Sequence, residues 1–186
     1  SSAASDVYKR QVNDKSLTLC SWNALRDLRD ETGETTQLAV MTNRKCAILE
    51  QCVSNQAIKV SGQVGMRVPV YSCAPGKSIL AKLPDNELKD YLKAVTLCKF
   101  TKRTLASRSA LMQGLKETEF NGYAVDLAEG LEGIHCVASV ILDDYHYPVG
   151  AITIIAPAFR MPPERFEEMG KACMEYASRI REKLLA

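Results

Sequence analysis

Residues 65–81 read GMRVPVYSCAPGKSILA, an extended apolar segment that ends in small residues and turns into a helix opened by proline, glycine and lysine. We expect this helix to run from Pro75 to Leu83. Such a turn directs free backbone N–H groups outward at the positive end of a helix dipole, which suits a carboxylate or a phosphate. The function then depends on which anion binds, and on whether the protein catalyses a reaction of that anion.

The segments before residue 65 predict one helix and three strands. The expected elements are an amphipathic helix over Ser16–Thr32 ended by Gly33, with Leu17, Trp22, Leu25 and Leu28 on its apolar face, and strands over Thr35–Met41, Cys46–Val53 and Ala57–Val64. The polar turn at residues 42–45 predicts a hairpin between the first two strands.

The segments after the central helix add three helices and a second hairpin. The expected elements are a short helix after Pro84 through Leu92, a helix capped by Ser107 or Ser109 with Leu111, Leu115 and Phe120 on one face and ended by Gly122, strands over Cys136–Leu142 and Val149–Ile155, and a helix from Pro162 or Pro163 to Leu185. Hairpins require antiparallel pairing, and helices separate the strand groups. The sequence therefore predicts an α+β fold with one antiparallel sheet flanked by helices.

The composition fits an ordinary globular domain of 186 residues, with 46% hydrophobic and 25% charged residues. A net charge of +2 gives no strong field for nucleic acid or membrane, and no apolar run reaches the length of a membrane span. The seven cysteines are odd in number and contain no C-x-x-C pair, which favours a reduced, cytoplasmic protein. With two histidines and no ligand-like spacing, we expect no metal and no cofactor.

The first eleven residues look foreign, because residues 6–11 resemble the translation of a sequencing adaptor. We therefore divide the chain into a non-native segment over 1–11, a linker helix over 12–33 and a sensing domain over 34–186. On this interpretation the native protein extends further at its N-terminus.

Three groups of residues could carry a binding or catalytic function. Gly76-Lys77-Ser78 matches the end of a phosphate-binding loop, but the first glycine of that motif is replaced by Tyr71. Cys136 follows His135, yet neighbours on a strand point to opposite faces and cannot form a dyad. A redox role for the cysteines stays open, with a buried structural role as the default; the candidates are Cys46, Cys52, Cys73 and Cys136.

Acidic residues after Gly122 allow two readings. Asp126, Glu129 and Glu132 form either a solvated acidic loop or a polar pocket wall, in which Asp126 accepts a hydrogen bond from a ligand hydroxyl or amide.

Taken together, five ordered segments are similar to one known family. They are residues 28–38, residues 65–81, residues 101–104 with Leu111, residues 122–126 with Glu129, and residues 133–138. This chain resembles, from Ser16 to its C-terminus, the C-terminal effector-binding domain of the IclR (isocitrate lyase regulator) family of bacterial transcription regulators.

The resemblance implies a GAF-like, profilin-like fold with a curved sheet, and a pocket for a small organic acid on its concave side. It also implies dimers that can pair into tetramers. It further implies that operator DNA is bound only through an N-terminal helix-turn-helix domain that this chain lacks, with no membrane contact.

The family's pocket positions carry over to ten residues of this chain. The helix-start donors fall at Ala74, Pro75 and Gly76, the apolar wall at Val60, Val68 and Ile134, and the polar positions at Asp126, Cys136 and Thr153, with Ile155 where relatives often carry serine. Pro75 lacks the N–H that relatives have there. Because Pro75 and Ile155 both remove polar groups, we expect an acid with an apolar tail.

Two function classes remain. The first is a ligand-sensing domain, with no catalytic residue, in which a small acid binds one arrangement of the protein more tightly and so alters DNA binding. The second is an enzyme on a GAF-like scaffold, such as a cysteine-based sulfoxide reductase. That enzyme needs two or more cysteines with lowered pKa at one accessible pocket.

Overall fold

A computed structural model describes residues 2–186, with side chains described at residue 14 and at residues 16–186. Its centre is a six-stranded antiparallel sheet in the order β3-β2-β1-β6-β5-β4. The elements are α1 (Ser2–Thr32), β1 (Thr35–Thr42), β2 (Lys45–Cys52), β3 (Arg67–Pro69), a 3-10 turn (Val70–Ser72), α2 (Ala74–Leu80), α3 (Asp85–Ala94), α4 (Arg108–Asn121), β4 (Ala124–Leu127), β5 (Ile134–Leu142), β6 (Pro148–Pro157), a second 3-10 turn (Pro163–Arg165) and α5 (Phe166–Leu185). The expected curved antiparallel sheet with flanking helices is confirmed.

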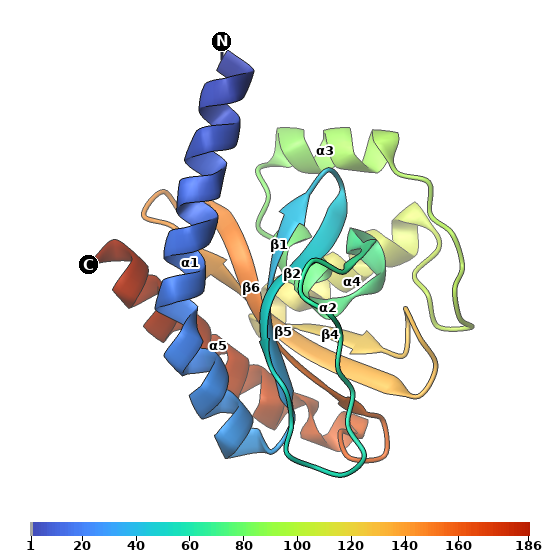
Figure 1. Cartoon of the computed structure of the whole chain (residues 1–186). Coiled ribbons are helices and arrows are strands. Elements are labelled where there is room, and N and C mark those ends of the chain that lie inside the picture. Colours follow the sequence, from blue (N-terminus) through green and yellow to red (C-terminus); the bar gives the residue numbers. More distant parts are fainter. Residues whose placement is uncertain (1) are drawn as a thin grey trace.

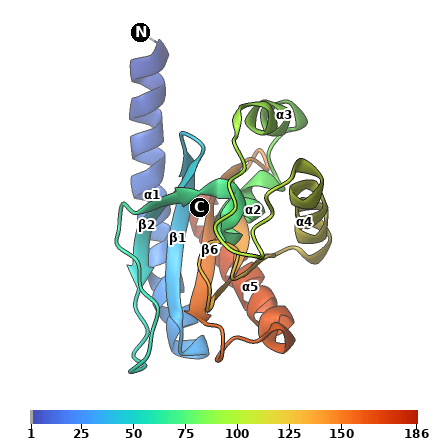
Figure 2. The same cartoon turned by 90° about the vertical axis from the view of Figure 1, so that its right-hand side faces the viewer.

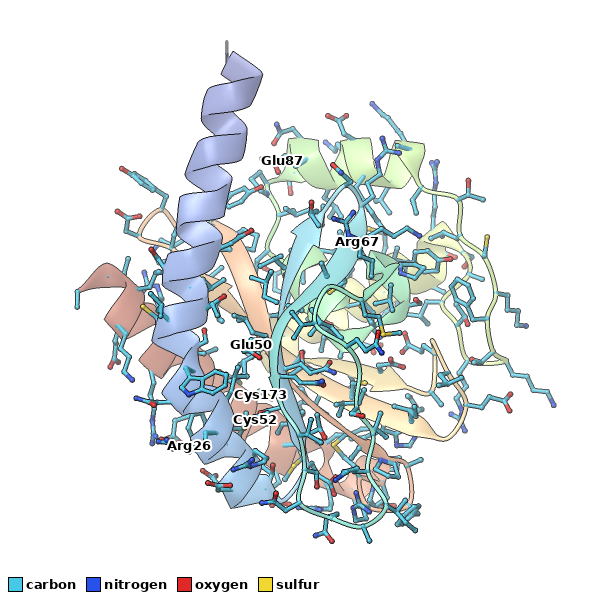
Figure 3. The ribbon with its side chains drawn as sticks, in the orientation of Figure 1. Arg26, Glu50, Cys52, Arg67, Glu87 and Cys173 are labelled. Carbon is cyan, nitrogen blue, oxygen red and sulfur yellow. The ribbon has the colours of Figure 1, made fainter. Side chains whose placement is uncertain are left out.

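The helices form two layers around this sheet (Figure 1). α1 and α5 cover one face, while α2, α3 and α4 lie on the other side, as the turned view also shows (Figure 2). The larger core lies under α1 and α5, where Leu25 and Met169 pack with strand residues such as Ile152. Cys52 and Cys173, labelled in Figure 3, pack in this same core.

Strand alternation divides the sheet residues between the two layers. On β5, Val137 belongs to the larger core, whereas its neighbours Cys136 and Ala138 pack under α2 with Ala74. Successive side chains of a strand point to opposite faces, so a run of apolar residues serves both layers. The continuous apolar runs of β5 and β6 follow from this double burial.

Several expected turns and caps are confirmed. The hairpin between β1 and β2 turns at Asn43 and Arg44, which both have positive φ, as a two-residue primed turn requires. Gly122 ends α4 in the left-handed conformation, and the Ser107 hydroxyl caps it by accepting from the Ala110 N–H at 3.2 Å.

Four expectations are wrong. Residues 57–64 form no strand, because the Gln51 side chain pairs with the backbone of Gly62 on both its N–H and its carbonyl, in place of a ladder. The central helix starts at Ala74 and ends at Leu80 rather than Leu83. Trp22 and Phe120 point outward, with 50% and 92% of their surface exposed. Strand β4 went unpredicted because it has only four residues, one of them Asp126.

The proposed division at residue 11 stays a prediction. α1 runs as one helix from Ser2 to Thr32, and the side chains of residues 1–13 lie outside the described part of the chain.

Gly76 provides a test of how tightly α2 packs. A Cβ at this position would lie 2.1 Å from the Val70 carbonyl oxygen, so Gly76→Ala must push α2 off the preceding turn. We expect a loss of about 3 kcal/mol or more in the free energy of unfolding, measured by urea denaturation.

Gly114→Ala is the matched control within α4. There the new methyl group meets only the end of the Leu105 side chain, and alanine favours a helix interior by about 1 kcal/mol. A neutral or stabilising effect is expected for this variant. Equal stability of the two variants would contradict the packing argument.

Candidate functional site

One row of side chains crosses three neighbouring strands under α2. Asp126 on β4 pairs with Cys136 on β5, which pairs with Ile155 on β6. The next row on the same face runs through Ala138 and Thr153. Ala74, at the start of α2, closes over these rows by packing with Cys136 and Ala138.

Lys77 points from α2 toward the loop that follows β4. Its ammonium group bonds both carboxylate oxygens of Glu129, at 2.6 and 2.7 Å, and also donates to the Val125 carbonyl. The two side chains are only 4% and 8% exposed. Since an ammonium has three donors, Lys77 has none left for a phosphate, and the phosphate-loop interpretation is unsupported.

The loop that carries Glu129 is held on its other side by two threonines. Thr101 donates to the Ala128 carbonyl at 2.7 Å, and Thr104 donates to the Glu129 carbonyl at 2.6 Å. Glu129 is therefore neither a solvated acid nor part of an open pocket wall. It is the buried partner of Lys77.

Asp126 is 5% exposed and forms no ion pair with any side chain that the structure describes. Its Oδ1 accepts a 2.6 Å hydrogen bond from the Glu129 N–H. Burial raises the pKa of Asp126 to about 7, helped by the nearby Glu129 carboxylate and opposed by Lys77 and by backbone N–H groups. This carboxyl group therefore exchanges its proton near neutral pH.

Thr153 has a hydroxyl without a protein partner. Its side chain is 1% exposed, and Oγ1 is one of three buried side-chain atoms in the described part of the chain that make no hydrogen bond. Its row neighbours explain this: Ala138 has nothing to offer, and the Gln37 amide is bonded to Gln51 at 3.3 Å. A buried hydroxyl without a partner is energetically costly, so this position is not optimised for folding alone.

The thiols of Cys136 and Cys73 are not activated as nucleophiles. His135 turns to the opposite face from Cys136, where its Nδ1 bonds the Met161 carbonyl at 2.9 Å and its ring packs edge-on against Phe166. Burial raises the pKa of the Cys136 thiol, and a hydrogen bond with Cys46, followed by burial, raises that of Cys73. A thiol nucleophile requires the opposite shift.

The structure brings together most of the ten residues that sequence reasoning selected. Those that lie under or at the start of α2 are Ala74, Pro75, Gly76, Asp126, Ile134, Cys136, Thr153 and Ile155. Val68 lies on β3 at the other edge of the sheet and packs with Val70 and Leu80, and Val60 lies in the irregular segment after β2.

Sequence reasoning missed the pairing of Lys77 with Glu129. The available signal was a lysine among apolar helix residues, three positions after Ala74 and hence on the same helix face. Sequence spacing could not show that Glu129 reaches it.

Two surface hollows lie elsewhere. One, of about 370 Å³, is lined by α1 and α5 residues that include Cys20 and Tyr176. The other, of about 280 Å³, lies beside Thr101 and His135. Neither is lined by the ten selected residues, so a shared cavity at those residues stays a prediction.

Comparison with known proteins decides the family. The family model described as the bacterial transcriptional regulator IclR C-terminal domain matches residues 12–182. The chain belongs to the IclR family. Two curated relatives agree: the HTH-type transcriptional repressor AllR of Klebsiella pneumoniae, 31% identical over 156 residues, and the transcriptional repressor IclR of Escherichia coli K12, 30% identical over 158 residues.

These matches cover 84% of this IclR-family chain but only 57% and 58% of the two relatives, so the chain spans little more than half of their length. The structure of the Thermotoga maritima IclR superposes with a TM-score of 0.86 at 35% identity, over 90% of this chain and 68% of that one. The C-terminal domain of the E. coli regulator KdgR gives a TM-score of 0.82 at 27% identity, over 91% and 98%. The curated relatives are repressors, not enzymes, and within the described residues no helix is long and apolar enough to span a membrane.

The buried ion pair predicts a large and non-additive effect on stability. Lys77→Met alone leaves Glu129 buried without its partner, and should lower the free energy of unfolding by about 3–5 kcal/mol. Adding Glu129→Leu should recover part of that loss. Chemical denaturation of the two single variants and the double variant measures the coupling.

Lys82 and Glu119 form the matched exposed pair, at 3.4 Å. Breaking it with Lys82→Met should cost at most about 1 kcal/mol, because water screens it. A double variant at Lys77 and Glu129 that loses the sum of the two single losses would contradict the pairing.

Asp126 predicts a pH-dependent stability. An acid whose pKa is raised on folding, here from 3.8 to about 7, holds its proton more firmly in the folded state. The free energy of unfolding therefore falls as pH rises through this range. Asp126→Asn should remove this pH-dependent contribution to the free energy of unfolding, so the variant gains stability relative to the native chain between pH 4 and pH 7. Urea denaturation at several pH values measures this, and parallel pH profiles for the two proteins would contradict it.

Proposed function

We propose that this chain is the effector-sensing part of a bacterial transcription repressor, and that its effector is a small organic acid bound between α2 and the sheet. Membership of the IclR family supports regulation, and the names of the relatives support repression. The observation that carries the site is the buried, unpartnered hydroxyl of Thr153, which lies one row along the sheet from the row of Asp126, Cys136 and Ile155.

The surroundings favour an acid with an apolar part. Ala74, Ala138, Ile134 and Ile155 line the α2 side of the sheet, while Pro75 offers no N–H. α2 has only seven residues, so its dipole adds little to anion binding. Recognition of the carboxylate therefore relies on hydrogen-bond donors such as the Thr153 hydroxyl and the Cys136 thiol.

Regulation follows from a population shift. The acid binds one arrangement of the protein more tightly, and this changes how a DNA-binding domain preceding α1 engages its operator. Self-association into dimers or tetramers and a cytoplasmic location belong to this proposal.

Thr153→Val tests the site. It removes the hydroxyl but keeps the shape, so binding of isovalerate or phenylacetate should weaken about 10-fold or more, since a hydrogen bond to a charged group contributes about 1.5–3 kcal/mol. The free energy of unfolding should stay equal or rise, because the native hydroxyl has no partner. Calorimetry and urea denaturation provide the two readings.

Thr101→Val is the control, because the Thr101 hydroxyl already bonds the Ala128 carbonyl and its loss should lower stability. If Thr153→Val binds both acids as tightly as the native chain does, the site is misplaced.

Ile155 sets the expected ranking of acids. Each buried methylene contributes about 0.8 kcal/mol, so isovalerate and phenylacetate should bind more tightly than the two-carbon acid glyoxylate. Ile155→Ser should narrow that difference. A thermal-shift screen finds the binders, since a ligand at 100 times its Kd adds about 2.7 kcal/mol of stability. Tightest binding of glyoxylate, unchanged by Ile155→Ser, would contradict the apolar-tail argument.

A further inference from the structure

The charged groups near Asp126 do not neutralise its carboxylate. Lys77 and Glu129 neutralise each other, and the three ammonium hydrogens of Lys77 are taken by the two Glu129 oxygens and the Val125 carbonyl. No donor of Lys77 is left for Asp126. Among the described residues, the charged side chains that act on Asp126 are thus this pair, whose charges sum to zero.

The thiols that face Asp126 add no charge. Burial raises the pKa of Cys136 on β5, and a hydrogen bond with Cys46, followed by burial, raises that of Cys73 before α2, so both thiols stay protonated. An ionised Asp126 is therefore the uncompensated charge of this cluster, buried to 5% exposure. Burial of such a charge is costly, and the group instead keeps a proton near neutral pH.

An effector carboxylate that reaches the row of Asp126 would bring a second negative charge. Against an ionised Asp126 it meets repulsion at low dielectric. Against a protonated Asp126 it finds an O–H donor, in addition to the Thr153 hydroxyl. Pro75 has no N–H to give, so a proton on Asp126 would add a donor to those of Thr153 and Cys136.

We propose that the effector carboxylate binds together with one proton from solvent, which resides on Asp126 and makes this residue a hydrogen-bond donor to the ligand. The inference rests on the proposed function, and it adds that repression responds to the acid and to pH jointly. Asp126 Oδ1 keeps its bond from the Glu129 N–H in both protonation states, so the proton goes to Oδ2.

Calorimetry with isovalerate, in buffers of different ionisation enthalpy, counts the protons taken up. Near pH 6 the uptake should be close to zero, because Asp126 already carries its proton. Near pH 8.5 it should approach one, and the Kd should rise about 10-fold per pH unit above pH 7. The neutral analogue isovaleramide should show no such uptake.

Asp126→Asn is the matched variant, and it should bind isovalerate with a pH-independent Kd and no proton uptake. Carbon-13 NMR of the native Asp126 carboxyl needs no variant. Its titration midpoint should move upward when isovalerate saturates the protein.

The outcomes separate the two proposals. Binding of isovalerate with no proton uptake near pH 8.5 and a constant Kd overturns the proton-linked inference while the acid-sensing function stands. Proton uptake that persists in Asp126→Asn, or that appears with isovaleramide, also overturns the proton-linked inference. Failure of every acid in the screen to bind near pH 6 overturns the proposed function and the inference together.

Discussion

The buried contact between Lys77 and Glu129 determines how the α2 side of the sheet is assembled. It joins a short helix to a loop 52 positions further along the chain, and each partner would be a costly buried charge without the other. Through this contact α2 is fixed over the sheet, and the loop after β4 is fixed against Thr101 and Thr104. The position of Asp126 follows, because the Glu129 backbone holds its carboxyl group.

The two faces of the sheet are packed with different kinds of side chain. Under α1 and α5, large aliphatic side chains such as Leu25, Ile152 and Met169 are fully or almost fully buried. Around Ala74, at the start of α2, the residues are smaller, as at Ala124 and Ala138, and polar groups lie between them. This small region therefore carries groups that are not optimal for folding, such as Thr153 and Asp126.

Most of the fold could be predicted from local patterns. The paired strands β1 and β2, the caps at Ser107 and Gly122, and the long strands β5 and β6 each follow from periodicity or turn chemistry. The prediction of a strand at residues 57–64 failed because their alternating pattern resembles that of a strand. In the structure, the Gln51 side chain bonds the backbone of this segment instead. The prediction that Trp22 faces the core failed because hydrophobicity alone does not show which helix face meets the sheet.

For the site, the resemblance supplied the residues. The buried ion pair and the unpartnered hydroxyl depend on distances between remote segments, which spacing cannot provide.

α1 combines two mechanical properties. Its second half is embedded in the core through Leu17, Leu25 and Leu28, while its first turns rise past the sheet (Figure 1). At 1.5 Å per residue, a helical arm of about 15 residues on the N-terminal side of Leu17 spans about 22 Å. A tilt of about 5° at the embedded end of such an arm would displace its far end by about 2 Å, as simple lever geometry gives. Repacking too small to alter the fold would thus be geometrically amplified at the distal end of a rigid rod.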